Sequence, residues 1–199
     1  MSAKRRARIA RKTAETEIVL EFCIDGMGMY EIRTGIGFFD HMLGLFARHG
    51  FFDLKLTAQG DLNVDAHHTV EDVGICLGQA IRRALGGRTG IVRYGTAFVP
   101  MDEALARVVL DLSGRSYLAY EVALPPLKVG AFDPGLVLSF FRALSDHAGM
   151  NLHVDLLRGR DGHHGLEAIF KAFGKALDQA SEFDERIEDV LSTKGTLEV

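Results

Sequence analysis

HHTVEDVGICLGQAIRRAL at residues 67–85 and HHGLEAIFKAFGKALDQA at residues 163–180 are two segments with the same opening pattern. In each segment, two adjacent histidines are followed three residues later by a glutamate. Apolar residues recur at helical spacing behind both openings, and Gly86 and Gly87 follow the first segment. Each segment is therefore predicted to form a helix, and the first helix is expected to begin at about residue 66. The recurrence indicates that the chain contains two similar units.

The strands and helices predicted before the first of these two helices come in the same order as those predicted before the second. Alternation of apolar and polar residues predicts strands at 18–24, 30–33, 54–56, 104–112, 116–122 and 152–156. Two shorter helices are predicted at 38–49 and 134–148, and the first two strands are expected to form a hairpin. Each half then follows the order β-β-α-β-α. The predicted fold class is α/β (α+β), with two similar half-domains packed as a pseudo-symmetric pair.

The repeat divides the chain into residues 1–93 and residues 94–199. The first repeat begins with a stretch of twelve residues that contains six lysines and arginines. This stretch is predicted to be a solvated tail, with a functional basic arm as the alternative. Residues 93–100 are expected to connect the halves. The second repeat ends in a tail that holds STKG at 192–195.

The composition favours a globular protein with one substantial core. The chain has 199 residues, of which 47% are hydrophobic. A net charge of -4 and a pI near 6.1 argue against nucleic acid as a partner. No apolar stretch reaches the ~18 residues of a membrane helix and no signal-peptide pattern is present, so a cytoplasmic protein is expected. Cys23 and Cys76 lack CxxC spacing and are expected to be reduced core residues.

The two histidine doublets are candidate metal ligands. Residues three or four positions apart share one face of a helix, so each glutamate can lie near both histidines of its own doublet. Adjacent residues point about 100° apart around the helix axis, so one doublet cannot easily close on one ion. We therefore predict two cations, with ligands pooled from both repeats or from neighbouring subunits. Imidazole and carboxylate without thiolate suit Mn²⁺, Fe²⁺ or Zn²⁺ better than Ca²⁺ or Mg²⁺.

Histidines can also cap a helix start or lie on a polar surface, and for a single doublet that would be the simpler interpretation. Two copies with the same glutamate spacing favour metal binding instead. His41 is a weaker candidate ligand. An ordinary surface or core role is the simpler interpretation for His49, His147 and His153.

Seven motifs span most of the chain: FFDHM (38–42), GDLNVDAHHTVEDVGICLGQA (60–80), RYG (93–95), PMDEAL (100–105), DLSGR (111–115), HHGLEAIFKA (163–172) and STKG (192–195). Together they resemble the imidazoleglycerol-phosphate dehydratase family. The resemblance implies a duplicated half-domain fold, assembly into 24 subunits with octahedral symmetry, and two Mn²⁺ ions per active site at subunit interfaces. It also implies a small phosphorylated imidazole substrate and a role in histidine biosynthesis.

The resemblance also assigns roles to individual residues. The implied metal ligands are His41, His67, His68, Glu71, His163, His164 and Glu167. The implied acid–base residues are Glu15, Glu71 and Glu167. The implied substrate-binding residues are Glu15, His41, His49, Arg93, Arg115, Lys171, Ser192, Thr193 and Lys194. Guanidinium groups and a hydroxyl are suitable donors for a phosphate, although each alone would more simply be ordinary surface charge.

The implied reaction removes water from imidazole glycerol phosphate and yields imidazole acetol phosphate. The proton to be lost is next to no carbonyl, so the electrons need another acceptor. A cation on the imidazole nitrogen would lower the pKa of the ring N–H and favour an imidazolate that helps to expel the hydroxyl. The alternative functions are a metal-storage or structural assembly and a di-metal hydrolase of phosphorylated or amide substrates.

One residue departs from the family pattern at a position that matters. Ser139 is equivalent to His41 in the second repeat, where the pattern often has a metal-binding histidine. A serine hydroxyl is a poor ligand for a divalent ion, so one site is expected to lack a protein ligand that water or His147 could replace. Asp161 and Leu191 are smaller departures, and they remove no group that the reaction needs.

Overall fold

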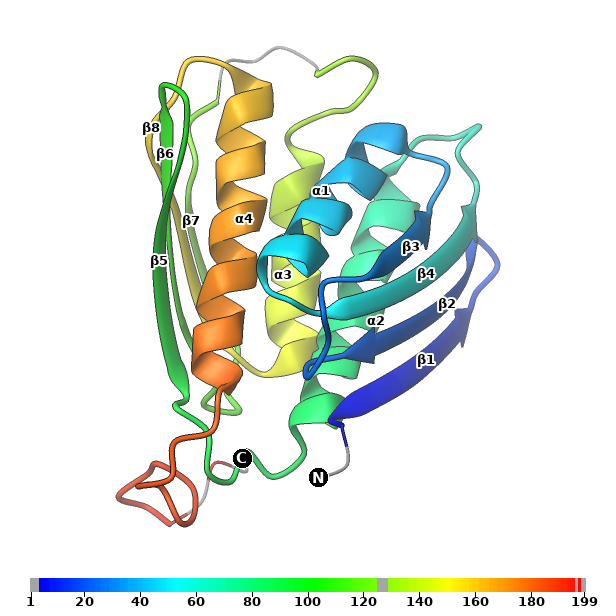
Figure 1. Cartoon of the computed structure of the whole chain (residues 1–199). Helices are drawn as coiled ribbons and strands as arrows, with labels where there is room; N and C mark the ends of the chain where they lie inside the picture. The colour runs from blue at the N-terminus through cyan, green and yellow to red at the C-terminus, as the bar shows by residue number, and fades with distance from the viewer. Residues whose placement is uncertain (1–3, 125–128, 196, 198–199) are drawn as a thin grey trace.

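The structure is a computed structural model that describes residues 4–124, 129–195 and 197. Two four-stranded sheets form the outer layers of the molecule, and four helices lie between them (Figure 1). Each sheet therefore buries one face against helices and leaves the other face exposed.

The two halves of the chain contribute one sheet and two helices each. The elements of the first half are β1 (Arg6–Lys12), β2 (Thr16–Cys23), β3 (Tyr30–Arg33), α1 (Gly37–His49), β4 (Asp53–Gly60) and α2 (His67–Leu85). The elements of the second half are β5 (Tyr94–Met101), β6 (Ala104–Asp111), β7 (Tyr117–Glu121), α3 (Leu136–Ala148), β8 (Asn151–Arg158) and α4 (Gly162–Ser181). The sheet orders are β1-β2-β4-β3 and β5-β6-β8-β7. The predicted fold class, with two similar halves, is confirmed.

Each half has one strand more than the sequence predicts. The order β-β-α-β-α is present twice, but β1 precedes it in the first half and β5 precedes it in the second. The basic stretch was expected to be a solvated tail, and most of it forms β1 instead. The expected connection at 93–100 is largely β5. Only Ile9 is fully buried in β1, because this strand lies at the sheet edge, where charged side chains are common and apolar alternation is weak.

The predicted hairpin between the strands at 18–24 and 30–33 is wrong. β4 lies between them in the sheet, pairing antiparallel with β2 and parallel with β3. Parallel neighbours need a crossover connection, and α1 provides it. β7, α3 and β8 repeat this arrangement in the second half.

Helices from different halves pack against one another. α1 lies against α4, and α2 lies against α3 (Figure 1). Two glycines at equivalent positions allow the close approach. A Cβ on Gly78 would lie 2.6 Å from the carbonyl oxygen of Leu144, and a Cβ on Gly174 would lie 2.6 Å from that of Phe46. This packing brings predicted ligands from both halves of the chain side by side.

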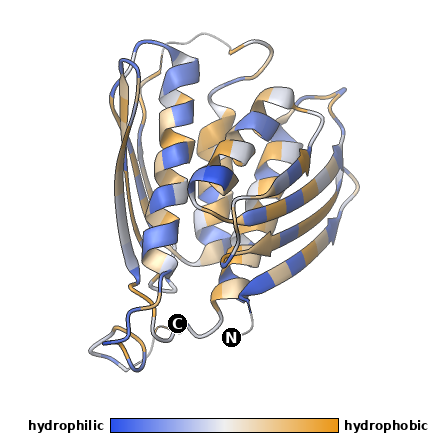
Figure 2. Cartoon of the chain, in the orientation of Figure 1, coloured by the Kyte–Doolittle hydropathy of each residue, from blue (hydrophilic) through white to orange (hydrophobic). Residues whose placement is uncertain are grey.

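Burial follows the period of each element. Every second residue of β2 and β6 is buried, and Figure 2 shows the same alternation of hydrophobic and hydrophilic residues along the strands. The inward faces of both sheets and of the four helices form one continuous apolar core. Within the residues that the structure describes, no helix is long and apolar enough to cross a membrane.

Candidate active site

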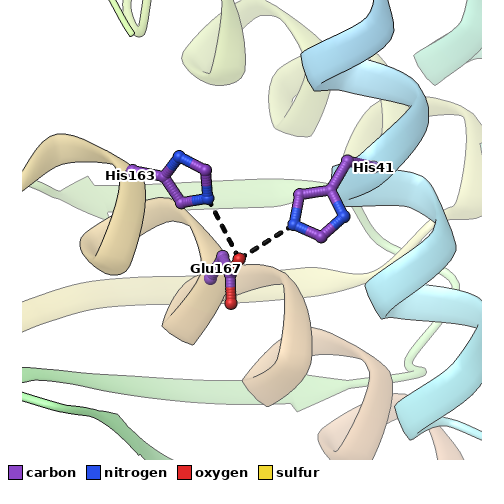
Figure 3. Close-up of side chains that lie close together, drawn as sticks. All are labelled: His41, His163 and Glu167. Atoms are coloured by element: carbon purple, nitrogen blue, oxygen red, sulfur yellow. Dashed lines mark hydrogen bonds and ion pairs between the residues drawn. The ribbon is translucent and has the colours of Figure 1, made fainter.

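Three predicted ligands from the two halves of the chain meet at one point. His41 lies on α1, and His163 and Glu167 lie one turn apart on α4 (Figure 3). Nε2 of His41 is 2.8 Å from Oε1 of Glu167, and Nε2 of His163 is 3.1 Å from the same oxygen. The potential ligand atoms all lie within 4.8 Å of one another. The imidazoles are nearly half exposed and the carboxylate is 11% exposed, so the carboxylate lies beneath two accessible rings.

Glu167 is held as a carboxylate by its neighbours. Nζ of Lys171, one turn further along α4, donates to Oε2 over 2.6 Å. Burial raises the pKa of Glu167, but the hydrogen bonds from Lys171 and His41 outweigh burial and lower the pKa to about 2. Glu167 is therefore ionised at neutral pH, as a carboxylate must be to bind a cation.

The equivalent place between α2 and α3 lacks one of the three groups. Nε2 of His67 is 3.8 Å from Oε2 of Glu71, which repeats the histidine–glutamate pair of α4 at a longer distance. Ser139 of α3 takes the place that His41 has in α1. When the two helices are aligned on these two residues, their buried positions largely coincide. Within the described parts of the chain, no second group of three histidine, cysteine or acidic side chains has its ligand atoms so close together.

The second histidine of each doublet is oriented by a carboxylate. Nδ1 of His68 lies 3.0 Å from Oδ2 of Asp61, and Nδ1 of His164 lies 2.8 Å from Oε2 of Glu103. An ionised carboxylate only accepts hydrogen bonds, so each Nδ1 carries a proton and each Nε2 presents a lone pair when the ring is neutral. These hydrogen bonds raise the pKa of both histidines. A carboxylate behind an imidazole is a common support for a metal-binding histidine.

Glu15 and Glu103 occupy equivalent places but face different atoms. Each directly precedes the second strand of its half, β2 or β6. Hydrogen bonds from His164 and from the backbone N–H of Asp161 lower the pKa of Glu103 to about 2. In the first half Asp61 holds the histidine instead, and Oε1 of Glu15 lies 3.7 Å from Nε2 of His68. Glu15 therefore faces the ligand side of this histidine.

Asp61 and Glu103 were not among the site residues predicted from the sequence. Both belong to quoted motifs, GDLNVD and PMDEAL. For Asp61 the available signal was an acidic residue shortly before a histidine doublet, whereas Glu103 lies far in sequence from the doublet that it contacts. The sequence did not show which loop reaches which ring, because that depends on how the strand ends meet the helix starts.

Five predicted substrate-binding residues line one cavity of about 600 Å³: Arg93, Arg115, Ser192, Thr193 and Lys194. They come from the residue before β5, the turn after β6, and the C-terminal tail. Three cationic side chains and two hydroxyls around one cavity are suited to a phosphate.

Arg93 is fixed in place by its partners. Its Nε and Nη2 donate to the two oxygens of Asp111 over 2.7 and 3.0 Å, and its Nη1 donates to the carbonyl of Leu191 over 2.5 Å. The hydrogen bonds with Asp111 raise the pKa of Arg93. A guanidinium has five N–H donors, so two remain for a ligand. The backbone of Arg93 has a φ of 74°, which is costly for a residue other than glycine and is often found at functional sites.

Comparison with known proteins identifies the family. A family model described as imidazoleglycerol-phosphate dehydratase matches residues 34–177. The chain belongs to this family. An imidazoleglycerol-phosphate dehydratase from Trichlorobacter lovleyi is 58% identical over 194 residues, which cover 98% of this chain and 100% of that protein. One from Acetivibrio thermocellus is 58% identical over 193 residues, which cover 97% and 99%.

Two solved structures of imidazoleglycerol-phosphate dehydratases share the fold. The enzyme from Staphylococcus aureus has a TM-score of 0.82 and 42% identity, covering 90% of this chain and 99% of that chain. The enzyme from Pyrococcus furiosus has a TM-score of 0.82 and 37% identity, covering 94% and 99%. Membership of the imidazoleglycerol-phosphate dehydratase family makes this chain a hydro-lyase of histidine biosynthesis.

Four residues that the family resemblance assigns to the substrate do not line the Arg93 cavity: Glu15, His41, His49 and Lys171. Lys171 is bound to Glu167 beside the histidine cluster. His49 is in the last turn of α1, where burial and the charge of Lys171 lower its pKa. Within one chain, therefore, the predicted imidazoleglycerol-phosphate dehydratase site is divided between two places.

These two places lie at opposite ends of α4. The histidine doublets are at the starts of α2 and α4, at the top of Figure 1. At the other end of α4, the backbone N–H of Arg93 donates to the carbonyl of Ala180 over 2.8 Å. α4 has 20 residues, so its ends are about 30 Å apart. A substrate made of one five-membered ring, three carbons and a phosphate is too short to reach both ends.

Proposed function

We propose that this chain catalyses the metal-dependent dehydration of imidazole glycerol phosphate to imidazole acetol phosphate. The observation that carries the proposal is the meeting of His41, His163 and Glu167, because it offers three donor atoms to one cation. Family membership supports the substrate and the reaction class. The cavity around Arg93 supports a phosphorylated substrate.

The donor set fits manganese or another borderline divalent cation. Two imidazoles and one ionised carboxylate leave positions open around an ion, as catalytic sites require. In this proposal His41, His163 and Glu167 hold one Mn²⁺. The remaining predicted ligands would complete this site and a second one in the assembly, with the two histidines of each doublet on different ions: His67, His68, Glu71 and His164. When bound, the ions supply positive charge that lowers the pKa of an imidazole N–H and draws electrons from the ring.

The residues of the chain bind the phosphate and move the protons. Arg93, Arg115 and Lys194 are proposed to neutralise the phosphate, with Ser192 and Thr193 as further donors. The hydroxyl leaves from the carbon attached to the ring, the proton leaves from the next carbon, and the resulting enol tautomerises to the ketone. Glu15 is proposed to accept the proton that leaves from carbon in the dehydration step, because its half-exposed carboxylate faces the ligand side of His68.

Glu71 and Glu167 are the other proposed acid–base residues, and their different surroundings favour Glu71 for proton transfer. A base works best when its pKa is near the working pH. With a pKa of about 2, Glu167 is a weak base, which favours its role as a ligand. The side chain of Glu71 is 47% exposed and its carboxylate lies 3.8 Å from Nε2 of His67, so Glu71 is the better candidate to transfer a proton.

The proposed active site is shared between subunits. The histidine cluster and the phosphate cavity lie about 30 Å apart along α4, so a complete site must combine the two ends of different chains. This supports a homo-oligomer with active sites at its interfaces, for which the family resemblance implies 24 subunits. Chelation is expected to shift a large particle toward small oligomers in sedimentation. A monomer with and without metal would contradict shared sites.

The activity test uses purified protein with a defined metal content. Protein freed of metal and then supplied with Mn²⁺ should convert imidazole glycerol phosphate to the acetol phosphate, and metal-free protein should not. Arg93→Ala and Lys194→Ala should weaken substrate binding while metal content is unchanged, which separates this function from a metal-storage assembly. Full activity after complete removal of metal would refute the proposal.

A further inference from the structure

A partly buried polar network ties α2 to the first two strands. Asp72 of α2 is 6% exposed. One of its carboxylate oxygens accepts from Nε of Arg11 on β1 over 3.0 Å, and Nη2 of Arg11 is 2.9 Å from the same oxygen. Its other oxygen accepts from the hydroxyl of Thr16 on β2 over 2.5 Å. None of these three residues touches the histidine cluster or the phosphate cavity in the contacts described above.

This network holds the turn that carries Glu15. Arg11 and Thr16 lie on the strands that flank this turn, one before it and one after it. The carbonyl of Glu15 accepts from the backbone N–H of Asp61 over 3.1 Å. The carboxylate of Asp61 in turn binds Nδ1 of His68. Asp72 therefore fixes both ends of the turn, and the turn meets the residue that orients His68.

The second half of the chain does without this network. β2 begins at Thr16 and β6 begins at Ala104, so these residues are equivalent. Arg11 pairs with the third residue of β2, as Val99 pairs with the third residue of β6. Asp72 follows the first histidine of its doublet by five positions, as Ala168 does. The second-half equivalents, Val99, Ala104 and Ala168, are all buried and apolar.

The comparison shows that this packing of a helix on a strand pair does not require charged groups. Replacing a buried ion pair by apolar residues of suitable volume is often neutral or stabilising. A network retained in only one half therefore calls for a local reason. Both hairpin turns place a carboxylate near the ligand side of a histidine, since Oδ2 of Asp102 lies 3.8 Å from Nε2 of His164, but the equivalent glutamates of the two turns are held differently. Glu103 is held by His164 and backbone N–H groups, whereas the Glu15 carboxylate faces the ligand side of His68 without such support.

We propose that Asp72 is a positioning residue that, through Arg11 and Thr16, holds the carboxylate of Glu15 at the ligand side of His68 during dehydration. This inference rests on the proposed function and deepens it. The carboxylate of Asp72 itself binds Arg11 and Thr16, which are not among the predicted ligands or substrate-binding residues. Misplacement of a reacting group by about 1 Å can cost on the order of 100-fold in rate, so a small movement of the turn has a measurable effect.

The kinetic test uses two variants of the network and one control. Asp72→Ala, and a triple variant with Arg11→Val, Thr16→Ala and Asp72→Ala that copies the second half, should each lose about 10- to 100-fold in kcat. KM should change less than threefold, and metal content should stay the same. Asp25→Ala breaks an ion pair with Arg5 at the other end of β1 and β2 and should keep the kcat of the wild type. The triple variant keeps the test informative if the single variant folds poorly.

A double-mutant comparison asks whether Asp72 acts through Glu15. Glu15→Gln should lower kcat by itself, and adding Asp72→Ala to it should lower kcat little further, because residues that act as one unit are not additive. Independent, multiplying losses would overturn the proposal. So would a triple variant with the kcat of the wild type.

Hydrogen exchange gives a measurement that does not depend on activity. In Asp72→Ala, the backbone amides of Asp61 and Thr16, which bond within the turn region, should exchange on the order of tenfold faster. The amide of Ile24, which donates to Arg5 at the far end of the strands, should be unchanged. Unchanged exchange at the turn would overturn the positioning role. If the wild-type protein fails to dehydrate the substrate, the proposed function fails, and exchange still decides whether Asp72 holds the turn.

Discussion

Replacing Glu167 by glutamine should remove a defined, pH-dependent part of the stability of the metal-free protein. Burial opposes ionisation of this carboxyl, but its hydrogen bonds with Lys171 and His41 lower its pKa from 4.5 to about 2. A pKa difference of this size corresponds to about 3 kcal/mol. Because the pKa is lowered on folding, this stabilisation is complete above about pH 4.5 and is lost as the pH falls toward 2. Glu167→Gln cannot ionise and lacks it at every pH.

The assay is thermal unfolding in chelator, at one protein concentration, from neutral pH down to pH 3. For a domain of this size, 1 kcal/mol shifts Tm by about 2–4 °C, so Glu167→Gln should melt about 6–12 °C below the wild type at neutral pH. The difference should narrow below about pH 4.5 as the wild-type carboxylate becomes protonated.

Glu71→Gln is the matched control for this measurement. Glu71 has the equivalent position on α2, but its side chain is 47% exposed and its nearest charged or ionisable partner is 3.8 Å away. Exposed pairs contribute less than about 1 kcal/mol, so the control should melt within about 4 °C of the wild type. A constant difference between wild type and Glu167→Gln over the whole pH range would refute the reasoning, and so would an equal loss in both variants.

Three further predictions concern the metal and the phosphate. His163→Ala leaves two of the three clustered donors and should remove one manganese per chain, as measured by metal analysis of the purified protein. Ser139→His supplies the histidine that α3 lacks and should tighten manganese binding at the α2 doublet by about tenfold or more in calorimetric titration; unchanged affinity would show that the two helix pairs are not equivalent. Asp111→Asn weakens the hydrogen bonds that position the Arg93 guanidinium. It should raise KM about tenfold at nearly constant kcat in steady-state kinetics.

The helices and the duplicated plan could be predicted because their signals are local and occur twice. All four helices lie within two residues of the expected bounds. The strands at the sheet edges were harder to recognise. β1 carries four charged side chains and only one fully buried residue. Its stability comes largely from pairing with β2, which no local pattern shows. The order of strands in the sheet was also hidden, since the crossover through α1 places β4 between two strands that are consecutive in sequence.

The candidate site was predictable as a set of residue types but not as an arrangement. The doublets indicated donors, and helix geometry indicated that donors would be pooled. That His41 meets α4 depends on the close packing of α1 at Gly174, which is a tertiary contact. The roles of Asp61 and Glu103 likewise depend on loops that approach a helix start from neighbouring strands. The separation of the metal and phosphate groups by the length of α4 could not be read from motifs at all.

That separation has a genetic consequence. If each catalytic centre combines the histidine end of one chain with the Arg93 end of another, a chain with a substitution at one end still contributes functional residues from its other end. Mixed particles built from His163→Ala and Lys194→Ala chains would then contain some centres assembled from two undamaged ends. Two alleles that are inactive alone would complement each other in one cell, and the recovered activity would depend on the ratio in which they are expressed.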